Sequence, residues 1–319
     1  MAYLRKPGWS KPSTILFATE IPANEKAFAF ALAQAAEFGA KLILFHAYDT
    51  LVVAASETSG IRYYDYAAAA RVETEHLEPL AKRVRDAGVP SEMIVRPGLA
   101  ADQIVAFLRE RTLDRIVMGT HSPGPISKLL IGSVAEAVLR SAMVPVCIIG
   151  PEVVDARYRN FETRTILCGM SLHESCHVVA AFAAELANEQ GARLILQHVI
   201  RAQDRKEVLA YRTIDQLEAE MTSLIPEELQ GKIAVQSVVV PGDPTEELLY
   251  QGRAQQADLI VLGAQGASAF AAVARQGVVY KLLAHSRCPV ITLSPVVLAA
   301  CGSKKAAAKP SEVFLAGVF

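Results

Sequence analysis

The chain has 319 residues, of which 52% are hydrophobic and 20% are charged, a composition typical of a globular protein. This length is sufficient for two domains, each with its own apolar core. The formal net charge of −1 provides no electrostatic reason to expect nucleic acid or an anionic membrane as a partner.

The predicted elements at the start of the chain are short apolar strands that alternate with longer helical patterns. A strand at residues 14–20 is followed by AFAFALAQAAEFG at residues 27–39, which is rich in helix formers. Gly39 suits the left-handed position that often follows a helix. The strands are apolar on both faces, which is typical of a parallel sheet covered by helices on both sides.

The sequence contains an internal repeat, with two copies of one unit. The matching segments are TILFATE (14–20) with TILCGMS (165–171), FGAKLILFHAY (38–48) with QGARLILQHVI (190–200), LDRIVMG (113–119) with ADLIVLG (257–263), and MVPVCII (143–149) with RCPVITL (287–293). Each copy supplies five strands, so we predict an α/β protein with two doubly wound, five-stranded parallel-sheet domains.

The predicted division of the chain follows from this repeat. We expect domains at residues 1–150 and 164–297, a linker at residues 151–163 and a C-terminal tail at residues 298–319. The first copy has about eight extra residues between its second and third strands, and we assign them to residues 49–66. Whether this insert covers the first domain's crevice or packs between the domains stays open.

A loop in the first copy has the layout of an anion-binding turn. MGTHSPGPISKLLIGSV, residues 118–134, follows an apolar strand and leads into a helix, but it matches neither the phosphate loop nor the dinucleotide fingerprint. In doubly wound folds, ligands bind outside the carboxyl ends of the strands, where the strand order reverses. This rule places Glu20, Ala47 and the loop around one crevice.

These features together resemble the universal stress protein family. The resemblance is carried by the acidic Glu20 after the first strand, by His46 and His198 near the ends of the second strands, and by the run IVMGTH with Gly132-Ser133 thirteen residues after Gly119. It covers nearly all of both copies. It implies a tandem two-domain stress-response or signalling protein with Rossmann-like domains, similar to adenine nucleotide hydrolases, that pair through their fifth strands about a pseudo-two-fold axis.

Members of this family that hold ATP or AMP carry Gly, two residues, Gly, nine residues, then Gly-Ser or Gly-Thr. Glycines let the backbone approach phosphate oxygens, and the helix that follows favours an anion at its N-terminus. The resemblance therefore implies an adenine nucleotide, ATP or AMP, in the N-terminal domain, without fast turnover. The nucleotide-binding residues that it implies are Thr19, Glu20, Ala47, Met118, Gly119, Ser122, Gly132, Ser133 and Val134.

Within this predicted site, Glu20 replaces the family's aspartate and is expected on the adenine or ribose side. The backbone of Ala47 is expected to contact adenine, while Ser122 stands where the second glycine of the loop is usual. The second copy departs further, because Gln276-Gly277 replaces Gly-Ser and Ser171 replaces the acidic residue. We expect its loop to be degenerate.

Other interpretations compete with nucleotide binding. A glycine after a parallel strand is often only a tight turn, and a Gly-Ser helix start is an ordinary cap. The protein would then be an interaction scaffold that kept the fold without a nucleotide. A weaker alternative is a metal-dependent hydrolase, because His173, Glu174 and His177 match the His-Glu-x-x-His pattern of zinc proteases. That motif falls in a first helical turn with no third ligand indicated, so we predict neither a metal site nor an enzyme.

The expected location is the cytoplasm. No apolar run approaches the ~18–20 residues that cross a bilayer, and the five cysteines form no Cys-x-x-Cys pair. We therefore expect no membrane partner, and the sequence leaves homo-oligomers and protein partners open.

Overall fold

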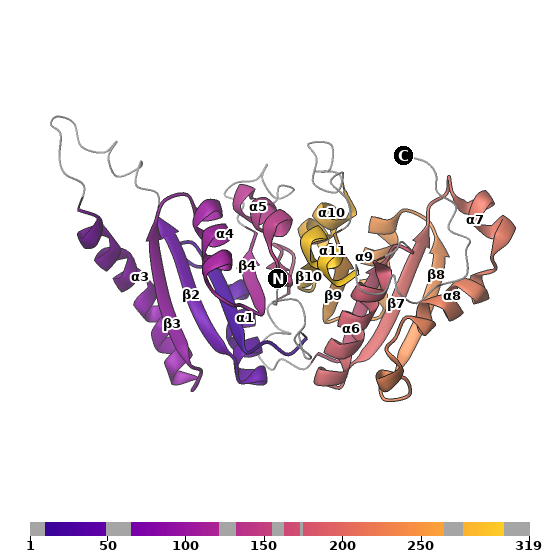
Figure 1. The fold of residues 1–319 in the computed structure, drawn as a ribbon, viewed down its shortest axis with the longest axis horizontal. Helices are drawn as coiled ribbons and strands as arrows, with labels where there is room; N and C mark the ends of the chain where they lie inside the picture. The colour runs from indigo at the N-terminus through magenta and orange to yellow at the C-terminus, as the bar shows by residue number, and fades with distance from the viewer. Residues whose placement is uncertain are drawn as a thin grey trace.

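The computed structural model describes residues 10–48, 65–120, 132–154, 163–172, 175–264 and 277–302. These residues form two similar α/β halves that lie side by side (Figure 1). The elements of the first half are β1 (Thr14–Thr19), α1 (Glu25–Phe38), β2 (Lys41–Tyr48), α3 (Tyr66–Asp86), β3 (Ser91–Pro97), α4 (Ala100–Glu110), β4 (Arg115–Gly119), α5 (Ser133–Ser141) and β5 (Val146–Ile149).

The second half repeats this order with some changes in its helices. Its elements are β6 (Thr165–Met170), α6 (Cys176–Gln190), β7 (Arg193–Ile200), α7 (Arg205–Tyr211), α8 (Ile214–Ser223), a short 3₁₀ turn (Glu227–Leu229), β8 (Val235–Pro241), α9 (Pro244–Ala254), β9 (Leu259–Gly263), α10 (Val278–His285), β10 (Val290–Leu293) and α11 (Pro295–Gly302). Among the described residues, no helix is both long and apolar enough to cross a membrane.

All ten of these strands belong to one sheet, in the order β3-β2-β1-β4-β5-β10-β9-β6-β7-β8. The order reads the same from either edge, as expected for a duplicated unit with a pseudo-two-fold axis. Every pairing within a half is parallel, while β5 and β10 pair antiparallel across the middle, with Cys147 opposite Ile291. The predicted fold of two doubly wound five-stranded units joined through their fifth strands is therefore confirmed.

Helices cover both faces of this sheet, which explains why the strands are apolar on both sides. Ile15 and Phe17 of β1 pack into the core beneath α1, α3, α6, α8 and α11. The alternate residues, Leu16 and Ala18, pack into the core beneath α4, α5, α9 and α10. Alternate side chains of one strand therefore pack into two separate apolar layers, one on each face of the sheet.

Local signals explain where α1 begins and ends. Asn24 is the N-cap, and its side-chain oxygen accepts a hydrogen bond from Ala27 N at 3.1 Å. At the other end Gly39 takes the left-handed conformation, with φ 63°, that residues without a Cβ adopt most easily. The helix predicted over residues 27–39 is thus confirmed, with its start two residues earlier.

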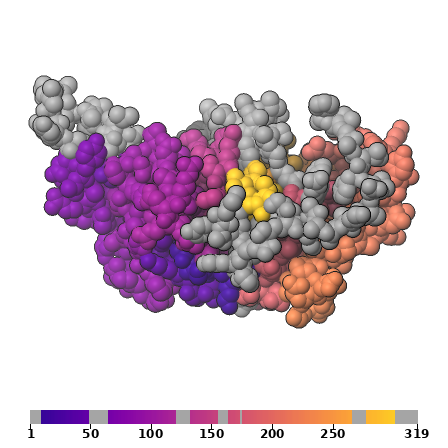
Figure 2. All heavy atoms as spheres, viewed as in Figure 1, coloured from indigo at the N-terminus to yellow at the C-terminus, as the bar shows by residue number. Residues whose placement is uncertain are grey.

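The segment that follows β10 is a helix rather than the start of a tail. Residues 298–302, predicted as the first part of a tail, belong to α11, in which Val297 and Leu298 are buried. The last described residues lie in the middle of the visible face, between the two halves (Figure 2). Ser294, just before α11, donates a hydrogen bond from its hydroxyl to Ala142 O in the first half. Burial of apolar side chains against the protein is what orders this segment.

Candidate functional site

The first half reverses its strand order between β1 and β4. From β1 the chain builds outward through β2 and β3, and it then returns to place β4 on the other side of β1. Ala18 pairs with Met118, so the next residues, Thr19 and Gly119, face one another across the carboxyl ends of these strands. The structure therefore brings both predicted residues to the edge where a doubly wound fold binds ligands.

Gly119 ends β4 directly beside the first turn of α1. A Cβ atom at this position would lie 2.6 Å from the side-chain nitrogen of Asn24, which is closer than real Cβ contacts come. A glycine is needed here because the helix cap approaches the strand end so closely. Sequence reasoning did not single out Asn24, although an asparagine just before a helical pattern is a recognisable N-cap signal.

The helix α5 begins at the same edge of the sheet, where β1 and β4 end. Its N-cap is Gly132, with φ −61° and ψ 151°, and it has no side-chain cap hydrogen bond. The first N–H groups of any helix lack intrahelical acceptors, and together with the helix dipole they favour an anion. Ser133 and Val134, both predicted to meet phosphate, are the first two residues of this helix.

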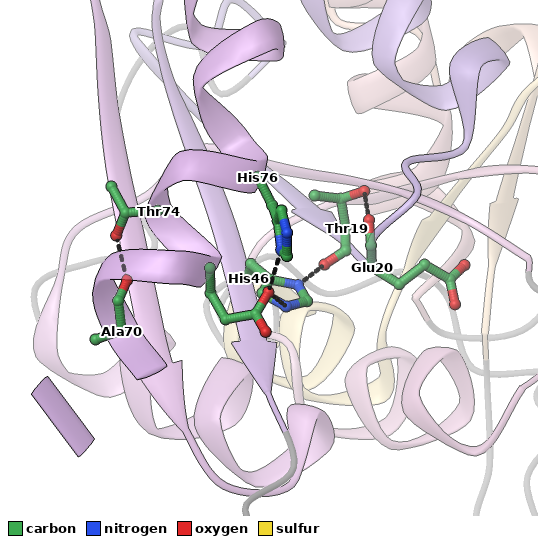
Figure 3. A network of polar contacts seen from close by, with 7 residues as sticks. Thr19, Glu20, His46, Ala70, Thr74 and His76 are labelled. Atoms are coloured by element: carbon green, nitrogen blue, oxygen red, sulfur yellow. Dashed lines mark hydrogen bonds and ion pairs between the residues drawn. The ribbon is translucent and has the colours of Figure 1, made fainter. Parts of the chain in front are cut away.

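The end of β2 adds His46 and Ala47 to this edge. Thr19 pairs with His46, and Nδ1 of the His46 ring lies 3.0 Å from Thr19 O. Figure 3 shows His46 beneath the Thr19 backbone, while the Glu20 carboxylate points away from it. The Thr19 hydroxyl in turn donates to Glu20 O at 2.9 Å. The backbone that leads into Glu20 is thus held by two polar side chains.

Some predicted residues lie outside the described part of the chain. Ser122 belongs to residues 121–131, which the structure does not describe, and His173 and Glu174 of the hydrolase pattern are likewise outside the described ranges. His177 lies in the first turn of α6, as the repeat predicts. Within the described ranges, no three histidine, cysteine or acidic side chains are grouped so that they could hold a metal ion.

The corresponding edge of the second half has a small cavity, lined by Gly169, Met170, Ser171, Cys176, Val179 and Gly263. A Cβ atom on Gly263 would lie 2.7 Å from Val179 Cγ2 and 3.4 Å from Leu298 Cδ1 of α11. Burial raises the pKa of the Cys176 thiol and keeps it in its neutral form. Val179 and Leu298 thus lie beside Gly263, whereas Asn24 lies beside the equivalent Gly119.

The helix after the second loop begins one residue later than the repeat suggests. Its N-cap is Gly277, with φ −66° and ψ 157°, nearly the conformation of Gly132. In the repeat, Gly277 aligns with Ser133 and Gln276 aligns with Gly132. A glycine N-cap is therefore common to both halves. What differs is the side chain beside the glycine that ends the strand, Asn24 beside Gly119 and Val179 beside Gly263.

Comparison with known proteins agrees with this architecture. Residues 12–150, and again residues 162–294, match the model of the universal stress protein family. The chain belongs to the universal stress protein family. The two matches follow one another along the chain, so this is a tandem member of the family.

Individual relatives are distant. Universal stress protein Rv2623 of Mycobacterium tuberculosis is 26% identical over 223 residues, which is 67% of this chain and 71% of that protein. Universal stress protein MJ0531 of Methanocaldococcus jannaschii is 35% identical over 75 residues, 24% of this chain, and the match spans less than half, 44%, of that relative's length. A universal stress protein structure from Archaeoglobus fulgidus has a TM-score of 0.64 at 17% identity, covering 89% of this chain and 98% of that one, and shows the shared fold.

Proposed function

We propose that the N-terminal half binds one adenine nucleotide, ATP or AMP, without fast turnover, and that the protein serves stress response or signalling through this binding. The observation that carries the proposal is the N-terminus of α5, which begins after the N-cap Gly132 at the edge of the sheet where β1 and β4 end. A helix start of this kind favours a phosphate, and the strand-order reversal is where doubly wound folds hold nucleotides.

Each predicted residue takes a role in this proposal. Backbone N–H groups of Ser133 and Val134 bind the phosphates, and Gly132 lets them approach because it has no side chain. Met118 and Gly119 form the floor between strand and loop, and Ser122 offers its N–H and hydroxyl from the loop. Thr19 and Glu20 form the adenine and ribose wall, and the backbone of Ala47 contacts adenine.

The asymmetry between the halves supports one nucleotide per chain. The first crevice has Asn24 and the backbone of Glu20 at its strand ends. The second has Val179 and Leu298 in contact distance of Gly263, so a polar ligand would displace well-packed apolar groups. We therefore assign nucleotide binding to the first half and an interaction or structural role to the second.

The direct experiment is to purify the protein, denature it and identify any released nucleotide by chromatography. We expect about one adenine nucleotide per chain, together with a rise in melting temperature when ATP or AMP is added to nucleotide-free protein. Absence of both would contradict the proposal and favour the interaction scaffold. A parallel metal analysis tests the hydrolase alternative, which stoichiometric zinc would support.

A further inference from the structure

Helix α3 is held over the carboxyl end of β2 by polar contacts near its N-terminus. The Tyr48 hydroxyl of β2 donates to Tyr66 O, at the start of α3, at 3.3 Å. Two turns further along, Glu73 Oε2 lies 3.6 Å from Nε2 of His46 and 3.0 Å from Nδ1 of His76. The two histidines thus share one carboxylate at the top of the proposed nucleotide crevice.

The hydrogen-bond partners of His46 define where its protons lie. Nδ1 is 3.0 Å from the Thr19 carbonyl oxygen, which can only accept, so Nδ1 carries a proton. The other ring nitrogen, Nε2, faces the Glu73 carboxylate at 3.6 Å. The ring therefore lies between the Thr19 backbone of β1 and the Glu73 side chain of α3.

The surroundings of this ring enclose the pair. His46 is 7% exposed and the Glu73 side chain is 25% exposed, whereas the His76 side chain is half exposed. Other charged side chains on these elements include Glu20 after β1, Glu25 and Lys26 on α1, and Arg71 and Arg83 on α3. Arg83 pairs with Glu25 at 2.8 Å, Lys26 donates to Val153 O, and the Glu20 carboxylate points away in Figure 3. Glu73 is thus the carboxylate paired with His46.

The second half provides an internal comparison. Its equivalent histidine, His198, keeps the strand-end contact, with Nδ1 3.0 Å from Met170 O. The helix before its third strand, α8, carries Glu218, but Glu218 Oε1 accepts a hydrogen bond from Val239 N at 3.1 Å. The histidine at the strand end is therefore a shared feature of the fold. In the first half, the histidine at this position also faces a glutamate of the covering helix, Glu73.

We propose that Glu73 is a positioning residue for the nucleotide site: it holds the His46 ring against Thr19 O and so clamps the Thr19–Glu20 backbone. The proposal rests on nucleotide binding in the first half for its effect on affinity. The Glu73 contact joins α3 to β2 and keeps the ring in the orientation in which Nδ1 meets Thr19 O. Removing the carboxylate should therefore loosen the Thr19–Glu20 backbone and weaken nucleotide binding.

The test compares the wild-type protein with Glu73→Gln, which preserves size and removes the negative charge. ATP dissociation constants are measured by calorimetry. We expect the dissociation constant of Glu73→Gln to be about fivefold or more larger than that of the wild type. His76→Gln is the matched control, because it leaves the His46–Glu73 pair in place and should behave as wild type.

A nucleotide-free measurement separates this proposal from the proposed function. Nitrogen NMR of labelled histidine reports the hydrogen bond between His46 Nδ1 and Thr19 O, and hydrogen exchange reports opening of the first turns of α3. We expect Glu73→Gln to shift the His46 Nδ1 signal and to speed exchange in α3, with unchanged circular dichroism. An unchanged His46 signal together with an unchanged ATP dissociation constant would overturn the clamp. If the NMR difference is present but the wild type binds no ATP, the proposed function is overturned instead.

Discussion

Replacing Gly132 with glutamine is expected to abolish nucleotide binding while leaving the fold intact. The backbone at this position is extended, with φ −61° and ψ 151°, which any residue can adopt. A glutamine side chain would stand at the open end of α5, next to the N–H groups of Ser133 and Val134. It would therefore occupy the space in which a phosphate has to approach these donors.

The magnitude follows from the number of hydrogen bonds lost. A hydrogen bond to a charged group contributes about 1.5–3 kcal/mol, so losing the two N–H donors would cost about 3–6 kcal/mol. Each 1.4 kcal/mol is a factor of ten, so the affinity should fall about a hundredfold or more. The cost to folding should stay near 1 kcal/mol, because the change replaces glycine, a favourable N-cap residue, with a poorer one.

The assay measures nucleotide released from purified protein and ATP affinity by calorimetry. Gly277→Gln is the matched control, since Gly277 is the N-cap of α10 with almost the same backbone angles, φ −66° and ψ 157°. That variant should carry the same folding cost and keep the wild-type nucleotide content. Full nucleotide affinity in Gly132→Gln would refute the reasoning, because the phosphates would then have to bind elsewhere.

Three further predictions concern stability and reactivity. Ile291 is fully buried and lies opposite Cys147 where the two halves join, so Ile291→Ala should lower the free energy of unfolding by about 2–5 kcal/mol in urea denaturation. A loss below about 1 kcal/mol would mean that this junction is loosely packed. Cys147 and Cys168 are fully buried, and burial raises the pKa of both thiols well above the ordinary range, so alkylation of the native protein at pH 8 should leave both unmodified until denaturant is added; rapid labelling of either in native protein would contradict this burial. The hydrogen bond from the Lys41 ammonium holds the pKa of Glu92 below its usual range, so the pair stabilises the protein above about pH 4.3 and loses this effect as the pH falls through the lowered pKa. Glu92→Gln should cost about 0.2–1 kcal/mol of unfolding free energy at pH 7 and progressively less in acid, and a cost independent of pH would exclude the ion pair as its source.

Much of the fold is determined by signals that are local in the sequence. The repeat alone predicts two copies of one α/β unit, because the same strand and helix patterns recur in the same order. The stop of α1 at Gly39 follows from the left-handed conformation that glycine adopts most easily. Apolar residues on both faces of each strand predict a sheet covered on both sides, and the two cores of the structure confirm it.

The sequence predicts part of the candidate site in the same way. The rule that ligands bind where strand order reverses brings Thr19 and Gly119 together, and the register of Ala18 with Met118 agrees with it. The start of α10 at Gly277 does not follow from the repeat, which aligns Gln276 with Gly132. Helix starts depend on caps and packing as well as on alignment, so a shift of one residue leaves no clear trace in the sequence.

Only the tertiary structure decides which distant residues meet. The contact of Asn24 with Gly119, the packing of Leu298 beside Gly263 and the approach of Glu73 to His46 each join segments that are far apart in the chain. No periodicity or propensity encodes such pairs, because those signals describe only the neighbourhood of a residue along the sequence. The pairs arise when the sheet closes and the helices dock on it, since burying the apolar faces sets which polar groups are left at the strand ends.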